Sequence, residues 1–280
     1  MVYLVATIAS DAEHLPTLLE RLRDEVAVPE VRPGGGEAWS VGYYADRRPL
    51  IIKKPGTLVP GRSIAELAGG LKSQVMLACI KNRNDVGRRS PPYRHGRWLF
   101  AHVGDLSGLE AQSARIRERL PTFFPGEADD TGPGALAFAM FRAELQRIGA
   151  GAEEDPLIAP SELRQALHRA AEAASGLARE ASLMLRAGFV ATNGRVIVAS
   201  RVGAPLWFRS KIGLEASADS PLLADPSSIG FKRLMESLAR FRAVVLAHAV
   251  REGQGQSEWV EVPEGRTLSV DHQLSVDLGG

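Results

Sequence analysis

The order of apolar patterns along the chain constrains the fold more than any single motif. Strand-like apolar runs occupy residues 2–9, 38–45, 49–54, 74–80 and 97–103, and they return after residue 182. Between them, residues 107–120, 134–148 and 161–181 repeat apolar side chains at helical spacing. Strands on both sides of a helical block favour an α+β fold, so we expect two antiparallel sheets packed together with helices outside.

Local signals agree with this layout. The first strand is followed by a helix pattern that places Leu15, Leu18, Leu19 and Leu22 on one face. The Asn193–Gly194 pair between two apolar runs predicts a tight hairpin. The helix over 161–181 begins with a serine that we expect to cap it. No linker-like stretch separates the halves, so we expect a single domain over residues 1–280.

Composition limits the function classes. The 280 residues carry a net charge of +1, which argues against binding to nucleic acid or to an acidic membrane surface. Cys79 is the sole cysteine, which excludes an internal disulfide and argues against a cysteine-built zinc site. No apolar run approaches the ~20 residues of a membrane span, and no Lys or Arg precedes the apolar start. We expect a cytoplasmic protein of bacterial type that uses no metal or cofactor.

Five segments in order resemble the class II glutamine amidotransferases, whose nucleophile is the N-terminal residue. EAWSVGYY (37–44) is similar to D-G-W-G-x-G-x-Y, and QVMLACIKNRND (74–85) to a strand ending in H-x-R-x-A-T. SPPYRHGRWLFAHVGDL (90–106) is similar to N-T-H-P-F followed by W-x-F-A-H-N-G. Residues 126–141 resemble a helix that starts T-D-S-E, and 246–270 resemble A-S-E-P and W-x-x-V-P-x-G-x-L-x-V. The resemblance implies a four-layer αββα sandwich.

The catalytic positions of that family are occupied by other residues here. The resemblance places Val2 where the nucleophilic cysteine stands, and a valine side chain cannot attack an amide. Val103 stands at the oxyanion-hole asparagine, while the neighbouring Gly104 is retained. Lys81 replaces the arginine that grips the substrate carboxylate, which keeps the charge but loses the bidentate geometry.

Ligand binding could survive the loss of catalysis. The resemblance assigns contacts with a glutamine-like ligand to Lys81 and Gly104, and it assigns the α-amine contact to Asp130, followed by Thr131. Cys79 lies far along the chain on a predicted central strand, so we expect it to pack as a core residue.

A second candidate surface is the loop over residues 81–97, which holds six Lys or Arg residues and one Asp. It could bind an acidic partner, a phosphate-bearing ligand or RNA, with an aromatic ring available for stacking. A solvated loop with routine charges is the alternative interpretation. The residues of this surface are Arg83, Arg88, Arg89, Tyr93, Arg94 and Arg97. His102 and His248 could form a metal pair, but no third ligand stands at a useful spacing, so buried core histidines are the preferred interpretation.

The sequence therefore favours a catalytically inactive amidotransferase-like protein that acts as a binding, regulatory or scaffold subunit with a protein partner. One alternative is an active amidotransferase or amidohydrolase with another nucleophile, such as Thr7 or Ser10 exposed by cleavage. A second alternative is an anion- or RNA-binding module that uses the 81–97 loop. The sequence leaves the oligomeric state open.

Overall fold

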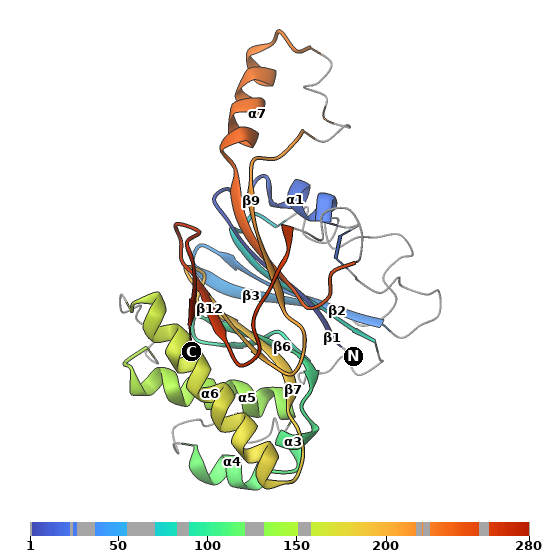
Figure 1. Ribbon diagram of the computed structural model, residues 1–280. Coiled ribbons are helices and arrows are strands. Elements are labelled where there is room, and N and C mark those ends of the chain that lie inside the picture. The colour runs from blue at the N-terminus through green and yellow to red at the C-terminus, as the bar shows by residue number, and fades with distance from the viewer. Residues whose placement is uncertain are drawn as a thin grey trace.

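Two antiparallel sheets form the centre of the molecule, which we describe from a computed structural model (Figure 1). The larger sheet has the strand order β11-β9-β10-β1-β4-β2-β3, and the smaller has the order β13-β12-β8-β7-β6-β5. Helices lie on the outer faces, so the predicted four-layer arrangement is confirmed. The structure describes residues 2–22, 25–26, 37–54, 71–82, 90–120, 132–150, 158–216, 220, 225–251 and 258–279.

The strands of the seven-stranded sheet come from both ends of the chain. They are β1 (Val2–Ala9), β2 (Glu37–Ala45), β3 (Arg48–Lys54), β4 (Val75–Asn82), β9 (Trp207–Ile212), β10 (Arg242–Ala247) and β11 (Val260–Glu261). Because β1 pairs with β10 on one side and β4 on the other, the start of the chain lies in the middle of this sheet.

The six-stranded sheet contains β5 (Tyr93–His95), β6 (Trp98–Asp105), β7 (Arg186–Thr192), β8 (Ile197–Val202), β12 (Thr267–Val270) and β13 (Val276–Gly279). The predicted Asn193–Gly194 turn joins β7 to β8, with Gly194 at φ +87° and the Asn193 side-chain oxygen accepting from Arg195 N at 3.0 Å. Strands β5 and β13 were not predicted. Both are short strands at the edges of the sheet, where few side chains are buried, so the sequence shows no clear alternation of apolar and polar residues.

Side-chain alternation on β6 explains why this strand is apolar on both faces. Leu99, Ala101 and Val103 point into a cluster between the two sheets. Trp98 and Phe100 point the other way, into the core under the helices. These helices are α3 (Ser107–Glu110), α4 (Ser113–Arg119), α5 (Pro133–Arg147) and α6 (Pro160–Glu180).

Two details of the helical block differ from the prediction. The helix expected over 107–120 is two short helices, because Gln112 N bonds the Leu109 carbonyl at 3.1 Å, which tightens and ends the first one. Helix α6 starts at Pro160, one residue before the serine that we expected to cap it. A proline is favourable at the first helical position, and Ala159 N donates to the Glu162 side chain at 3.3 Å.

The outer face of the seven-stranded sheet carries α1 (Leu15–Arg21), whose buried leucines match the predicted stripe. A further helix, α7 (Ile229–Arg240), lies between β9 and β10 in the chain. None of the helices that the structure describes is both long and apolar enough to cross a membrane.

Candidate functional site

Val2 and Lys81 stand opposite each other at one end of the central strands. They are Cα partners in the antiparallel β1–β4 ladder, and Lys81 also pairs with Ala38 of β2. Val2 is only 6% exposed, and its side chain belongs to the apolar cluster between the sheets. The structure describes Lys81 by its backbone alone. The two positions implied by the resemblance are thus adjacent in this sheet.

Val103 lies on the facing sheet and is completely buried. Its Cα partner is Gly188 of β7, and a Cβ on Gly188 would lie 3.0 Å from Val103 Cγ2. Val2 and Val103 belong to the same inter-sheet cluster, which also contains Leu4, Ala101 and Leu246. The side chains at the expected nucleophile and oxyanion-donor positions are therefore both hydrocarbon, and both are buried in one inter-sheet cluster.

Gly104 follows Val103 at the point where β6 leaves the buried layer. Its φ of +90° disfavours any residue with a side chain, and an added Cβ would lie 2.0 Å from the Arg186 carbonyl oxygen. Backbone geometry alone accounts for a glycine at this position. Its retention therefore carries no information about catalysis.

Cys79 is the one thiol of the chain, and its position makes it chemically inert. It lies on β4 between Leu4 and Ser40 of the neighbouring strands and is 2% exposed. Burial raises the pKa of its thiol to about 12. Because the thiolate is the nucleophilic form, Cys79 supplies almost none of it near neutral pH.

The alternative nucleophiles lie farther along β1. Thr7 is fully buried in the middle of the strand, opposite Met76 and Val245. Ser10 follows the strand, and its hydroxyl accepts from Arg242 N at 3.0 Å. Cleavage before either residue would remove most of β1 from between β4 and β10. Since β1 pairs on both sides, such processing would disrupt the sheet that holds the site.

The residues predicted to form one anion-binding surface have different environments in the structure. Tyr93 is 8% exposed and stacks on His102, with ring centroids 6.1 Å apart, so its ring cannot stack on a nucleotide base. Arg94 is exposed and donates to the Pro49 carbonyl at 3.2 Å, while Arg97 is half-buried. The remaining residues of that surface and of the ligand contacts lie outside the described residues: Arg83, Arg88, Arg89, Asp130 and Thr131.

The two histidines considered as a metal pair belong to different sheets, because His102 lies on β6 and His248 follows β10. His102 packs with Tyr93 under the helices, whereas His248 lies edge-on to Tyr3. His248 Nδ1 donates to the Pro205 carbonyl at 2.9 Å. Within the described ranges, no group of three or more His, Cys, Asp or Glu side chains could hold a metal ion.

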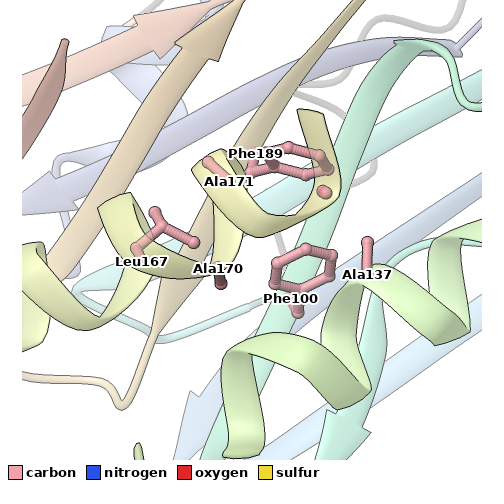
Figure 2. Close-up of a pocket in the computed structure, with 7 residues that line it drawn as sticks. Phe100, Ala137, Leu167, Ala170, Ala171 and Phe189 are labelled. Carbon is pink, nitrogen blue, oxygen red and sulfur yellow. The ribbon is translucent and has the colours of Figure 1, made fainter. Parts of the chain in front are cut away.

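A small cavity lies between α5, α6 and the six-stranded sheet (Figure 2). Its volume is about 10 Å³, and apolar side chains line it: Phe100, Ala137, Leu167, Ala170, Ala171, Ala174 and Phe189. This space is at the lower limit for one water molecule and offers no polar partner. It is a packing defect rather than a ligand site.

The fold is shared with solved class II glutamine amidotransferase structures. A glutamine aminotransferase class-II domain protein from Silicibacter pomeroyi aligns over 99% of this chain and 98% of its own, with a TM-score of 0.57 and 17% identity. A predicted glutamine amidotransferase from Pseudomonas aeruginosa aligns over 98% of each chain, with a TM-score of 0.55 and 12% identity. No protein-family model and no curated protein matches the sequence. The fold implied by the sequence resemblance is thereby confirmed.

Proposed function

We propose that this chain is a catalytically inactive protein with the class II glutamine amidotransferase fold, acting as a binding, regulatory or scaffold subunit. The observation that supports this most is the shared apolar cluster of Val2 and Val103. By the sequence resemblance, these residues stand where the family has its nucleophile and an oxyanion donor. Loss of one such donor costs roughly 10²–10³ in rate, and loss of the nucleophile removes the covalent route.

Binding of a glutamine-like ligand is a separate part of the proposal. Lys81 retains a positive charge for a carboxylate, although a lysine contacts it as a point charge rather than as a fork. Asp130 is the proposed contact for the α-amine, and Thr131 is a further proposed ligand-binding residue beside it. A ligand held this way would be bound without being hydrolysed, as in a sensor.

The experiment is a glutamine hydrolysis assay on the wild-type chain and on the triple variant Val2→Cys, Lys81→Arg, Val103→Asn. We expect no glutamate from the wild type and measurable glutamate from the triple variant, because the variant restores the family's three side chains on an intact scaffold. Thermal unfolding of both proteins controls for the fold. Wild-type hydrolysis that co-purifies with the chain would refute the proposal.

A further inference from the structure

Three hairpin turns lie at the end of the sandwich opposite the candidate site. Strand β2 begins beside Lys81 and β6 ends just after Val103, so the turns after β2 and before β6 are at the far end of each strand. The turn between β7 and β8 is at the same end, because β7 pairs with β6 in the antiparallel direction. A left-handed residue tightens each turn: φ is +65° at Arg47, +52° at Gly96 and +87° at Gly194.

Tyr44 connects these turns. Its hydroxyl lies 2.8 Å from the Arg97 carbonyl oxygen and 2.7 Å from the Thr192 carbonyl oxygen, so segments of both sheets contact one side chain. Its ring packs against the third turn, because a Cβ on Gly194 would lie 2.7 Å from Tyr44 Cδ1. Its backbone N–H donates to Ser73 Oγ at 3.0 Å, which adds the segment before β4. Four segments that are distant in the sequence are therefore held in one arrangement.

The charges of these four segments are strongly unbalanced. Residues 44–48, 71–73, 93–97 and 192–195 contain six Lys or Arg residues and one carboxylate, whereas the whole chain has 34 cations and 33 anions. The Arg94 guanidinium donates to the Pro49 carbonyl at 3.2 Å, which places it on β3 beside Arg48. We call the six cations the basic end: Arg47, Arg48, Lys72, Arg94, Arg97 and Arg195.

Five of the six cations face solvent, and Arg97 is half-buried. Within the part of the chain that the structure describes, no carboxylate forms an ion pair with Arg47, Arg48 or Lys72. The single carboxylate of the four segments is Asp46, which lies in the first turn. The basic end is therefore a positively charged surface with room for further anionic groups.

Neighbouring strand ends do not cancel this charge. They add two carboxylates, Asp11 after β1 and Asp271 after β12, which accept backbone N–H groups of their own turns at 2.9 and 2.8 Å. Even with both counted, the cations at this end outnumber the carboxylates by two to one. Because the turns are fixed through Tyr44, a partner would not have to order them on binding.

The residue types indicate which anion fits. Five of the six cations are arginines, whose planar guanidinium groups bind carboxylates through paired hydrogen bonds. Recognition of single-stranded RNA needs exposed rings that stack on bases, and here Tyr44 and Tyr93 are each only 8% exposed. The basic end therefore matches carboxylate groups better than nucleotides.

We propose that the basic end binds an acidic segment of a partner protein, with aspartate and glutamate carboxylates placed on the arginines. This inference rests on the proposed binding role and names the chemistry of the partner. The surface lies at the opposite end from Val2 and Lys81, and its test involves no glutamine. Binding at the basic end and loss of hydrolysis can therefore fail separately.

Fluorescence anisotropy of the full chain with a labelled peptide of about eight glutamates, at low salt, tests the surface. One variant reverses two charges of the basic end, Arg48→Glu with Arg195→Glu. The matched control is Lys232→Glu with Arg233→Glu, because these exposed cations of α7 give the same change in net charge elsewhere. We expect the first variant to bind the peptide about tenfold more weakly or worse, and the control to bind within about twofold of the wild type.

Two further probes identify what is bound. A glutamine peptide of the same length should not bind, and a single-stranded RNA of the same length should bind more weakly than the glutamate peptide. The neutral variant Arg48→Gln with Arg195→Gln should show a smaller loss than the charge reversal, and circular dichroism verifies that each variant is folded. A wild type that does not bind the glutamate peptide, equal losses in the two charge-reversed variants, equal binding of the glutamine peptide, or tighter binding of RNA would overturn the proposal.

Discussion

Val103 and Gly188 are direct cross-strand partners, and the Val103 methyl occupies the space that a side chain on residue 188 would fill. The pair lies where the two sheets pack against each other, and side chains there are close-packed, so an added methyl group has no free volume to occupy. The position that the resemblance gives to a catalytic amide is therefore part of the packed core. The Val103 side chain fits there because its cross-strand partner, Gly188, has no side chain.

Substitution of Gly188 by alanine should destabilise the protein by about 1–3 kcal/mol, because the new methyl group presses on Val103 Cγ2. Val103→Ala should relieve this contact, so the double variant should lose less stability than the sum of the single variants. Urea unfolding of the four proteins gives the coupling energy, which we expect to be about 1 kcal/mol.

Gly176→Ala is the control for that cycle. Gly176 lies in α6, and a Cβ there would meet nothing within 4 Å, so alanine should stabilise the helix by about 1 kcal/mol. Additive effects of Gly188→Ala and Val103→Ala would contradict the packing relationship described here.

The Cys79 thiol should not react in the folded protein. At pH 8 its raised pKa of about 12 leaves almost no thiolate, and its 2% exposure excludes reagents. We expect a chromogenic disulfide reagent to titrate one thiol per chain in guanidinium chloride and essentially none in native buffer. Rapid native labelling would show that Cys79 is accessible.

Burial of the same thiol predicts a loss of stability at alkaline pH. Below pH 9 the thiol is protonated in both states and contributes no pH dependence. Between its ordinary value of 9.0 and the folded value of about 12, only the unfolded thiol ionises, so rising pH favours unfolding by about 1.4 kcal/mol per unit. Urea unfolding at pH 8 and pH 10 should show this additional loss in the wild type and not in Cys79→Ala.

The two carboxylates that pair with Arg209 should contribute differently to the free energy of unfolding. Glu25 is 21% exposed and also accepts from Trp259 Nε1 at 3.1 Å, whereas Glu258 is 57% exposed. Glu25→Ala should cost about 3 kcal/mol, because it leaves the Trp259 indole N–H without its acceptor and leaves the buried guanidinium with only the more exposed carboxylate of Glu258. Glu258→Ala should cost less than about 1 kcal/mol. Chemical denaturation measures both, and equal losses would count against this assignment.

Sequence reasoning succeeded where one physical signal dominated. The apolar runs of β1 and β6 and the leucines of α1 predicted their elements, because burial on a sheet or helix face requires those periods. The motif resemblance predicted the two-sheet fold, which the matched structures confirm. Within that fold, Val2 and Lys81 are cross-strand partners, and Val2 and Val103 belong to one apolar cluster.

Other features depend on contacts between distant segments. Tyr93 was expected on a basic surface loop, but its ring is enclosed by His102, Phe100 and Phe138, which no local pattern indicates. Helix α7 did have a local signal, the Ser228 cap followed by apolar residues at helical spacing over 231–238, and the helix was not predicted.

The central claim is that no side chain of this protein can attack glutamine, and covalent capture tests it most directly. The purified chain is incubated with an electrophilic glutamine analogue, such as a chloroketone, and its intact mass is measured. We predict an unchanged mass for the wild type and a single adduct for the variant Val2→Cys, Lys81→Arg, Val103→Asn. A stoichiometric wild-type adduct that free glutamine prevents, mapped to any residue, would contradict the account.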